Sequence, residues 1–346
     1  MVLFYPMQKV LQYQIPSHKK IISFANLFSA WRGFQNGKRK KKDVAEFAQN
    51  LIHNLSVLEN DLLYYRYSHS GYFHFKISDP KPRDIHKALV RDRIVHHALY
   101  RALYPYFDQK FIHDSYSCRI NKGTHKAMNR FRTFFRIVSK NNTKTCFVLK
   151  CDIRKFFANI DHGILKNILS RLNLDSDIPW LFSQVIDSFS TPKYIYAIAD
   201  ICKKGLPLGN LTSQLLVNIY MNEFDQFVKR ELKVKYYVRY ADDFIVLSQD
   251  KKYLEDILEQ MKEFLENRLK LQLHPDKVFI KTIASGVDFL GWVHFPKHRV
   301  LRTSTRRRMI KSTKNNPKPE TVQSYLGMLE HGDTYKLKRK LSIKTE

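Results

Sequence analysis

Three aspartates at the ends of strand-like segments constrain the fold of this chain more than any other feature of its sequence. Asp152 ends a buried strand predicted over residues 145–152, and Asp242 and Asp243 occupy the turn of a hairpin predicted over residues 237–247. If these strands neighbour each other in one sheet, the three carboxylates come together. They would then repel each other unless a cation compensates their charge.

Mg²⁺ is the cation that suits such a cluster, because it is hard and uses one or two carboxylates together with substrate phosphates. Two Mg²⁺ ions about 3.5 to 4 Å apart can clamp the attacking and leaving oxygens of a phosphoryl transfer. The alternative is that paired aspartates are simply good turn residues, which holds for most such pairs taken alone. The surrounding sequence has to decide between the two.

The charge of the chain points to a polyanionic partner. The 346 residues include 60 Lys and Arg against 32 Asp and Glu, a formal net charge of +28. Nucleic acid is the expected partner of such a chain. A membrane-surface protein would gather its basic residues on one amphipathic helix, whereas here they spread from Lys9 to Lys344. A hydrophobic content of 44% excludes an intrinsically disordered chain.

The cysteines and the N-terminal sequence indicate the compartment. No CxxC pair and no histidine at zinc spacing accompanies the four cysteines, so we expect reduced thiols rather than disulfides or a structural metal site. Residues 1–16 contain no sustained apolar segment, and no apolar run approaches the ~18 residues of a membrane-spanning helix. The sequence therefore predicts a soluble, cytoplasmic protein without a membrane partner.

Helical patterns surround the predicted strands. We expect helices within residues 21–65, a helix ending near Pro105, a helix over residues 157–172 and a strongly amphipathic helix over residues 254–269. The basic run 38–42 is either a solvated loop or a phosphate-contacting loop, and the sequence leaves both open. Mixed helices and strands give an α/β (α+β) fold class.

Six ordered motifs around the aspartates resemble those of reverse transcriptases. Tyr240-Ala241-Asp242-Asp243 resembles the YxDD signature of that family. The other five, in chain order, are a fingers motif Ser115–Arg119, the strand end Asp152–Phe157, a template- and nucleotide-binding loop Gly205–Gln214, a palm motif Leu273–Lys277 and a primer grip Phe289–Trp292. One YxDD is a weak signal, but six motifs in order over roughly residues 83–292 are a strong one.

Within that family, the motifs are most similar to the reverse transcriptases of diversity-generating retroelements, which are prokaryotic and phage systems that copy a template RNA with errors at adenine. The segment Leu208–Gln214 decides this resemblance. Group II intron and related bacterial enzymes usually carry Gln at the position of Leu208 and Pro at the position of Gln214. Ser117-Cys118 also departs from the Gly-Phe common before the fingers arginine.

The resemblance implies a right-hand polymerase fold with fingers, an antiparallel-sheet palm and a short helical thumb. It divides the chain into an N-terminal helical extension with the start of the fingers (1–80), fingers (81–145), a palm (146–295) with a fingers segment near 165–210, and a thumb (296–346).

The resemblance also implies catalytic roles. Asp152 and Asp242 would bridge two Mg²⁺ ions, Asp243 would help the ion that activates the primer 3′-hydroxyl, and the backbone carbonyl of Ile153 would complete the ligand set. Lys277 would protonate the departing pyrophosphate, the alternative being a solvated lysine at a strand edge.

Substrate-binding roles follow from the same resemblance. Arg119, with Lys110 as a second candidate, would meet the triphosphate charge, since the chain has no GxxxxGK[ST] loop. Phe157 would exclude a ribose 2′-hydroxyl. The remaining implied contacts are Leu208, Gly209, Ser213, Gln214 and Tyr240. The alternatives are a surface salt bridge for Arg119, a core side chain for Phe157 and a loop hydrophobe for Leu208.

The implied function is RNA-directed DNA synthesis, in which the enzyme extends a primer on template RNA with dNTPs, and in a diversity-generating retroelement this serves mutagenic retrohoming. Expected partners are template RNA, RNA/DNA duplex, dNTPs and a small basic accessory protein. The basic stretch 302–314 would grip the template-primer backbone. Two alternatives remain. One is a retron, antiphage-defence or group II-like reverse transcriptase, and the other is an RNA-binding, maturase-like protein, against which the three aspartates argue.

Overall fold

The computed structural model describes residues 15–78, 82–189, 203–314 and 318–342, and these form two compact units that are described separately. Unit 1 consists of Met1–Lys76, Asp84–Phe111 and Ile160–Tyr220, and unit 2 of Ile77–Arg83, Ile112–Asn159 and Met221–Glu346. No helix within the described ranges is both long enough and apolar enough to span a membrane.

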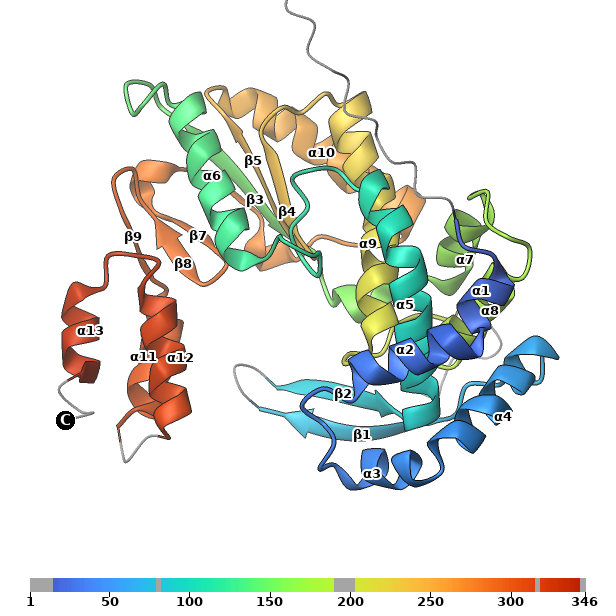
Figure 1. The fold of residues 1–346 in the computed structure, drawn as a ribbon. Helices are drawn as coiled ribbons and strands as arrows, with labels where there is room; N and C mark the ends of the chain where they lie inside the picture. The colour runs from blue at the N-terminus through green and yellow to red at the C-terminus, as the bar shows by residue number, and fades with distance from the viewer. Residues whose placement is uncertain (1–14, 79–81, 190–202, 315–317, 343–346) are drawn as a thin grey trace, which may run out of the picture. The chain divides into compact units, whose positions relative to one another are not determined.

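Unit 1 is mainly helical and is built around the long helix α5(Val90–Lys110), which packs against α2(Phe24–Phe34) (Figure 1). Most of a two-stranded sheet, in which β1 pairs with β2, also belongs to this unit. The other elements are α1(His18–Ile22), α3(Lys42–Gln49), α4(Leu51–Leu63), β1(Tyr72–Ile77), β2(Arg83–Ala88), α7(His162–Ser170), α8(Ile178–Asp187) and the first residues of α9(Leu211–Gln226).

Two expected helix boundaries in this region were wrong. Helix α5 does not end near Pro105 but continues through it to Lys110. The proline removes one backbone donor, yet Phe107, two residues later, is only 2% exposed, and its burial favours continued helix. The helix expected over residues 157–172 is instead a short 3-10 turn η1(Phe156–Asn159) followed by α7, because Asp161 caps the start of α7 by accepting a hydrogen bond from the Ile164 amide (3.1 Å).

Unit 2 contains the expected antiparallel sheet, with strand order β4-β5-β3-β6. The strands are β3(Phe147–Asp152), β4(Tyr237–Tyr240), β5(Asp243–Ser248) and β6(Phe279–Thr282). Because side chains alternate along a strand, Val148 and Ile245 face helix α6(Thr124–Val138), whereas Phe244 faces the opposite side, where it meets Phe224 of α9. Helix α10(Lys251–Leu269) covers that second side (Figure 1).

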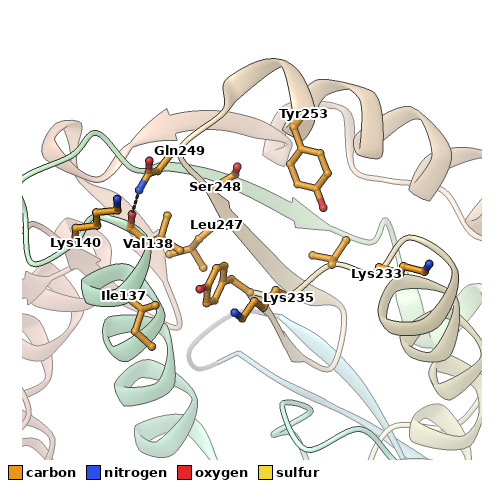
Figure 2. A pocket seen from close by; sticks show the side chains of 11 residues that line it. Ile137, Val138, Lys140, Lys233, Lys235, Leu247, Ser248, Gln249 and Tyr253 are labelled. Carbon is orange, nitrogen blue, oxygen red and sulfur yellow. Dashed lines mark hydrogen bonds between the residues drawn. The ribbon is translucent and has the colours of Figure 1, made fainter.

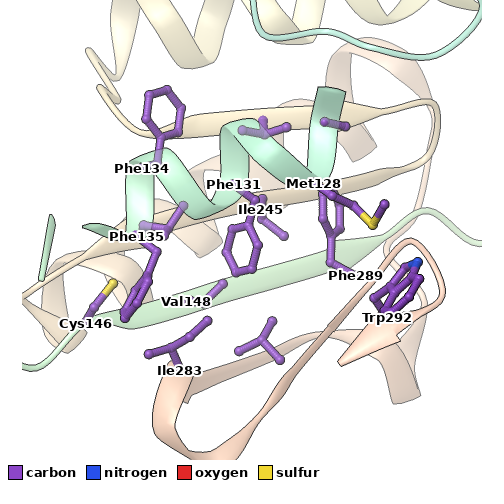
Figure 3. Packing of buried hydrophobic residues seen from close by; sticks show 14 of the residues in the cluster. Met128, Phe131, Phe134, Phe135, Cys146, Val148, Ile245, Ile283, Phe289 and Trp292 are labelled. Atoms are coloured by element: carbon purple, nitrogen blue, oxygen red, sulfur yellow. The ribbon is translucent and has the colours of Figure 1, made fainter. Parts of the chain in front are cut away.

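A second, three-stranded antiparallel sheet shares the core under α6. Figure 3 shows Phe131 of α6 in the buried cluster that also contains Val148 of the first sheet and Phe289 of the second, and the rings of Phe131 and Phe289 lie 5.7 Å apart. The sheet consists of β7(Val287–Phe289), β8(Trp292–His294) and β9(Arg299–Leu301), and it is followed by α11(Thr303–Ser312), α12(Pro319–Leu329) and α13(Tyr335–Ser342). Single-turn elements are η2(Phe227–Glu231), η3(Pro275–Lys277) and η4(Ile283–Ser285).

Candidate active site

The register of β3 against β5 brings the predicted carboxylates together. Asp152, the last residue of β3, is the direct ladder partner of Asp243, the first residue of β5. Asp242 precedes Asp243 in the hairpin turn, and its carbonyl accepts a hydrogen bond from the Ile153 amide (3.1 Å). Ala241 turns the chain with a φ of 55°, a left-handed conformation that costs a non-glycine residue energy. All three aspartates therefore lie at one end of the sheet in unit 2.

A pocket of about 340 Å³ opens at this end of the sheet. Its lining combines the three aspartates with basic and aromatic side chains, namely Lys150, Asp152, Tyr240, Asp242, Asp243, Asp276, Lys277, Phe279, Asp288, Leu290 and Arg302. Predicted catalytic side chains from β3, the hairpin turn and η3 thus share one cavity.

Two lysines neutralise part of the carboxylate charge. The Lys277 ammonium donates a hydrogen bond to Asp152 Oδ1 (3.0 Å), and the Lys150 ammonium lies 3.3 Å from Asp243 Oδ2. Burial raises the pKa of Asp243 to about 7, and the charge of Asp152 adds to this effect although Lys150 opposes it. Burial and then the charge of Asp152 raise the pKa of Asp242 as well. When all three aspartates are ionised, their charge exceeds that of the two lysines, and the raised pKa values show that this ionised state is costly without a further cation.

The residues present fit a hard divalent cation in their chemistry. Asp243 Oδ1 is buried without a hydrogen-bond partner, so one carboxylate oxygen is left for a further positive group. The carboxylates do not converge on one point as metal ligands do: in the part of the chain that the structure describes, no three His, Cys, Asp or Glu side chains are arranged to hold a metal ion. Asp152 instead engages Lys277, and Asp243 engages Lys150.

Other predicted residues of unit 2 occupy defined positions. Arg119 is half-buried, and its Nη1 donates hydrogen bonds to the carbonyls of Ile112 (2.7 Å) and Ser115 (3.0 Å). The hydroxyl of Thr124 donates to that of Tyr240 (3.2 Å).

The two phenylalanines after Asp152 differ in burial. Phe156 is 4% exposed and belongs to the core, whereas Phe157 is half-buried, with its ring edge-on to that of Phe156 at 5.6 Å. The core role is therefore taken by the neighbour of Phe157.

The remaining predicted residues lie in unit 1. Lys110 ends α5 with its ammonium 4.8 Å from the ring of Tyr106. The carbonyl of Leu208 accepts a hydrogen bond from the amide of His86 on β2 (3.1 Å). Gly209 has a φ of 110°, and a Cβ added there would lie 3.0 Å from Cγ2 of Ile85, so the position favours glycine. The other two, Ser213, which is buried, and Gln214, which is half-buried, lie on the first turn of α9.

Sequence reasoning missed three charged residues that the structure places at or beside this site. Lys150 lies two residues before Asp152, so strand alternation puts both side chains on one face, and a lysine inside an apolar strand was the available signal. Arg239 and Asp225 form a fully buried ion pair next to the hairpin turn. An arginine within the apolar strand β4 signalled a buried partner, but nothing in the sequence identified Asp225 as that partner.

Comparison with known proteins agrees with this geometry. Residues 78–294 match the family described as reverse transcriptase (RNA-dependent DNA polymerase). Over 286 residues the chain is 27% identical to Protein YkfC of Escherichia coli, covering 73% of this chain and 72% of that protein. Over 329 residues it is 23% identical to the group II intron-encoded protein LtrA of Lactococcus lactis subsp. cremoris, covering 77% of this chain and 53% of LtrA, so that it matches about half the length of that relative.

Among solved structures, apo telomerase from Candida tropicalis, truncated from its C-terminal domain, matches with a TM-score of 0.49 and 14% sequence identity, covering 72% of this chain and 60% of the telomerase chain. The expected fold class, helices combined with antiparallel sheets, is confirmed by the strands of unit 2. Since the family match covers more than half of the chain and contains the three aspartates, this protein belongs to the reverse transcriptase family of RNA-dependent DNA polymerases.

Proposed function

We propose that this protein extends a nucleic-acid primer on an RNA template with dNTPs, by phosphoryl transfer at the pocket formed around Asp152, Asp242 and Asp243. The observation that carries the proposal is the ladder pairing of Asp152 with Asp243 in a cavity that also contains Lys277. An RNA-binding protein without polymerase activity would have no use for three carboxylates whose burial and mutual repulsion raise the pKa of two of them.

Mg²⁺ would be held by the three aspartates and the backbone carbonyl of Ile153. When bound, it would supply charge neutralisation for the transferred phosphoryl group and lower the pKa of the primer 3′-hydroxyl. The chain's own residues do the rest. The Lys277 ammonium, 3.0 Å from Asp152, holds a proton inside the pocket that the leaving pyrophosphate can accept. Arg119 offers a guanidinium to the incoming triphosphate, and Phe157 limits the space beside its ribose.

Helix α11 and the strands before it would bind the template-primer duplex. A pocket of about 790 Å³ at the start of α11 has basic side chains in its lining, among them Arg302, Arg307, Arg308 and Lys311. Such side chains contact phosphates and position a duplex without reading its sequence. The loop residues Leu208, Gly209, Ser213 and Gln214, with Tyr240 in the YxDD turn, would contact the template base and the nucleotide, and Lys110 remains a candidate phosphate contact.

Two subtypes of reverse transcriptase are supported by different observations. Leu208 and Gln214 favour the error-prone enzyme of a diversity-generating retroelement, which would act in mutagenic retrohoming with a small basic accessory protein. The similarity to LtrA favours a group II intron-like enzyme. Both subtypes require the same chemistry at Asp152, Asp242 and Asp243.

Primer extension by the purified full chain tests the proposal. We expect cDNA from an RNA template, a DNA primer, dNTPs and Mg²⁺, and none when EDTA replaces the metal. Asp242→Asn should remove synthesis but leave template-primer binding within about twofold, because a single buried carboxylate contributes little to phosphate affinity. Undiminished synthesis by Asp242→Asn would refute the assignment. Sequencing the cDNA separates the subtypes, since errors concentrated opposite template adenine support the retroelement and a flat error spectrum supports the intron-like enzyme.

A further inference from the structure

Among the described residues of unit 2, Arg239 on strand β4 and Asp225 on α9 are more deeply buried than any of the three clustered aspartates. Arg239 and its partner Asp225 are both 0% exposed. Arg239 donates from Nε to Asp225 Oδ1 (2.8 Å) and from Nη2 to Asp225 Oδ2 (2.6 Å), and the Tyr237 hydroxyl adds a third hydrogen bond to Asp225 (2.8 Å). The Asp225 carboxylate is thus fixed by three donors.

The guanidinium also reaches two segments that carry proposed functional residues. Nη1 donates to the carbonyl of Ala241 (3.1 Å), the left-handed residue directly before Asp242. Nη2 donates to the hydroxyl of Ser115 (3.1 Å), in the loop that leads to Arg119. The Arg239 side chain therefore contacts both the turn that carries Asp242 and the loop that leads to Arg119.

Backbone hydrogen bonds reinforce this connection. The Arg239 amide donates to the carbonyl of Asp114 (3.0 Å), and the Tyr116 amide donates to the carbonyl of Arg239 (3.0 Å), so that residues 114–116 lie parallel to β4. Arg119 in turn bonds the carbonyl of Ser115. A displacement of Arg239 would therefore shift the anchor of Arg119 together with the turn that holds Asp242.

We infer that Arg239 is a positioning residue of the polymerase, which together with Asp225 sets the hairpin turn of Asp242 and Asp243 and the loop of Arg119 in one fixed arrangement. This inference rests on the proposed function, because it assigns the turn to the reacting phosphate and Arg119 to the nucleotide.

Burial of the pair favours this role over simple stabilisation. Removing two charges from water costs about as much as their attraction returns, so a buried ion pair is weak evidence for stability. What an apolar pair of equal size could not provide is the set of directed hydrogen bonds to Ala241 and Ser115. Lysine could not provide it either, since only the guanidinium presents several donors in one rigid plane.

Three variants of the full chain separate positioning from stability. Arg239→Lys keeps the charge beside Asp225 but cannot donate to Ala241 and Ser115 at once. Ser115→Ala removes only the hydroxyl on the loop side. Tyr237→Phe is the matched control, because it takes one hydrogen bond from Asp225 without altering a donor to the turn or the loop. Each variant is measured for melting temperature, template-primer affinity, kcat and the KM for dNTP.

We expect Arg239→Lys to lower kcat about 10- to 100-fold, since a displacement of about 1 Å at a reacting group can cost that much. Ser115→Ala should raise the KM for dNTP by about three- to tenfold, because it removes roughly one hydrogen bond from the loop residue that holds Arg119. Its kcat should change less than about twofold. Tyr237→Phe should lower the melting temperature with both kinetic constants unchanged. Template-primer affinity should stay the same in all three.

The inference is overturned if Arg239→Lys keeps wild-type kcat, or if the kinetic losses of the three variants simply follow their losses of melting temperature. If Arg239→Lys fails to fold, the KM of Ser115→Ala for dNTP tests the inference by itself, and an unchanged KM overturns it. A wild-type protein without template-directed synthesis would refute the proposed function instead, so the two failures are distinguishable.

Discussion

Replacing Phe157 with alanine tests whether its ring selects deoxyribonucleotides. Phe157 is half-buried in the turn five residues after Asp152, whereas Phe156 beside it is 4% exposed. If the Phe157 ring fills the space of a ribose 2′-hydroxyl, Phe157→Ala should admit ribonucleotides. Phe156→Ala is the matched control, because it removes an identical ring from the core side of the same turn.

The structure sets the size of both effects. Rejection by shape alone is typically worth about 1 to 3 kcal/mol, which converts to a roughly 5- to 150-fold rise in the rNTP-to-dNTP ratio of kcat/KM for Phe157→Ala. Truncating a fully buried phenylalanine costs about 3 to 5 kcal/mol, so Phe156→Ala should lose that much free energy of unfolding and Phe157→Ala about half of it. The selectivity change should thus accompany the smaller loss of stability.

Single-nucleotide primer extension with one matched dNTP or rNTP measures the ratio, and urea unfolding measures the free energy. An unchanged ratio in Phe157→Ala would show that this ring only packs against Phe156. Equal changes of the ratio in both variants would show that the turn as a whole, rather than one ring, controls the sugar.

Four further predictions concern binding, fidelity, packing and pH. The logarithm of template-primer affinity should fall linearly with log salt, by about 0.7 to 0.9 per neutralised phosphate, and a flat response would contradict binding driven by the +28 charge. Leu208→Gln should reduce misincorporation by about tenfold or more, because an amide can hydrogen-bond near the templating pair, and identical error spectra in sequenced cDNA would exclude Leu208 from fidelity. Gly332→Ala should cost about 1 to 3 kcal/mol of unfolding free energy, because the added methyl would clash with the Trp292 ring, whereas Gly327→Ala should gain about 0.5 to 1 kcal/mol, because this exposed position of α12 has no atom within 4 Å of an added Cβ. Chemical unfolding of both variants measures the two changes, and the opposite sign in either would contradict the prediction. Burial lowers the pKa of His294 from 6.5 to about 3, so between these pH values the unfolded chain binds a proton that the folded chain does not, and the free energy of unfolding falls as the pH drops below 6.5. At about pH 5 the wild type should have lost about 2 kcal/mol more of its free energy of unfolding than His294→Leu, and urea titrations that show no such difference would refute this prediction.

Strand periodicity and turn position made the core of the site predictable. The apolar run before Asp152 and the short separation between β4 and β5 specified two strands and a hairpin, and the structure confirms that both belong to one sheet. The predicted helix end at Pro105 was wrong because the burial of Phe107, which depends on tertiary packing, outweighs the local preference of proline for ending a helix.

The buried ion pair was unpredictable for a different reason. An arginine in an apolar strand requires a partner, yet many acidic residues could serve, and only the packing of α9 against β4 selects Asp225. Lys150 was equally hidden, because its strand position predicted a shared face with Asp152 but not the 3.3 Å approach to Asp243 from the neighbouring strand. Pairings across strands and helices are properties of the assembled core rather than of any one segment.

The pairing of β3 with β5 also determines where the chain can tolerate an inserted or deleted residue. Asp152 and Asp243 are direct partners on the face that carries Lys150, and side chains alternate with every residue. One codon inserted or deleted within residues 148–151 would turn Lys150 or Asp152 toward α10 and separate the carboxylates, even if every other residue were kept. Length changes after Ser248, at the opposite end of the ladder, where Gln249 and Tyr253 line a separate pocket of about 370 Å³, leave the pairing of the aspartates intact (Figure 2). A length change inside these two strands is therefore expected to abolish synthesis, whereas a length change after Ser248 is expected to preserve it.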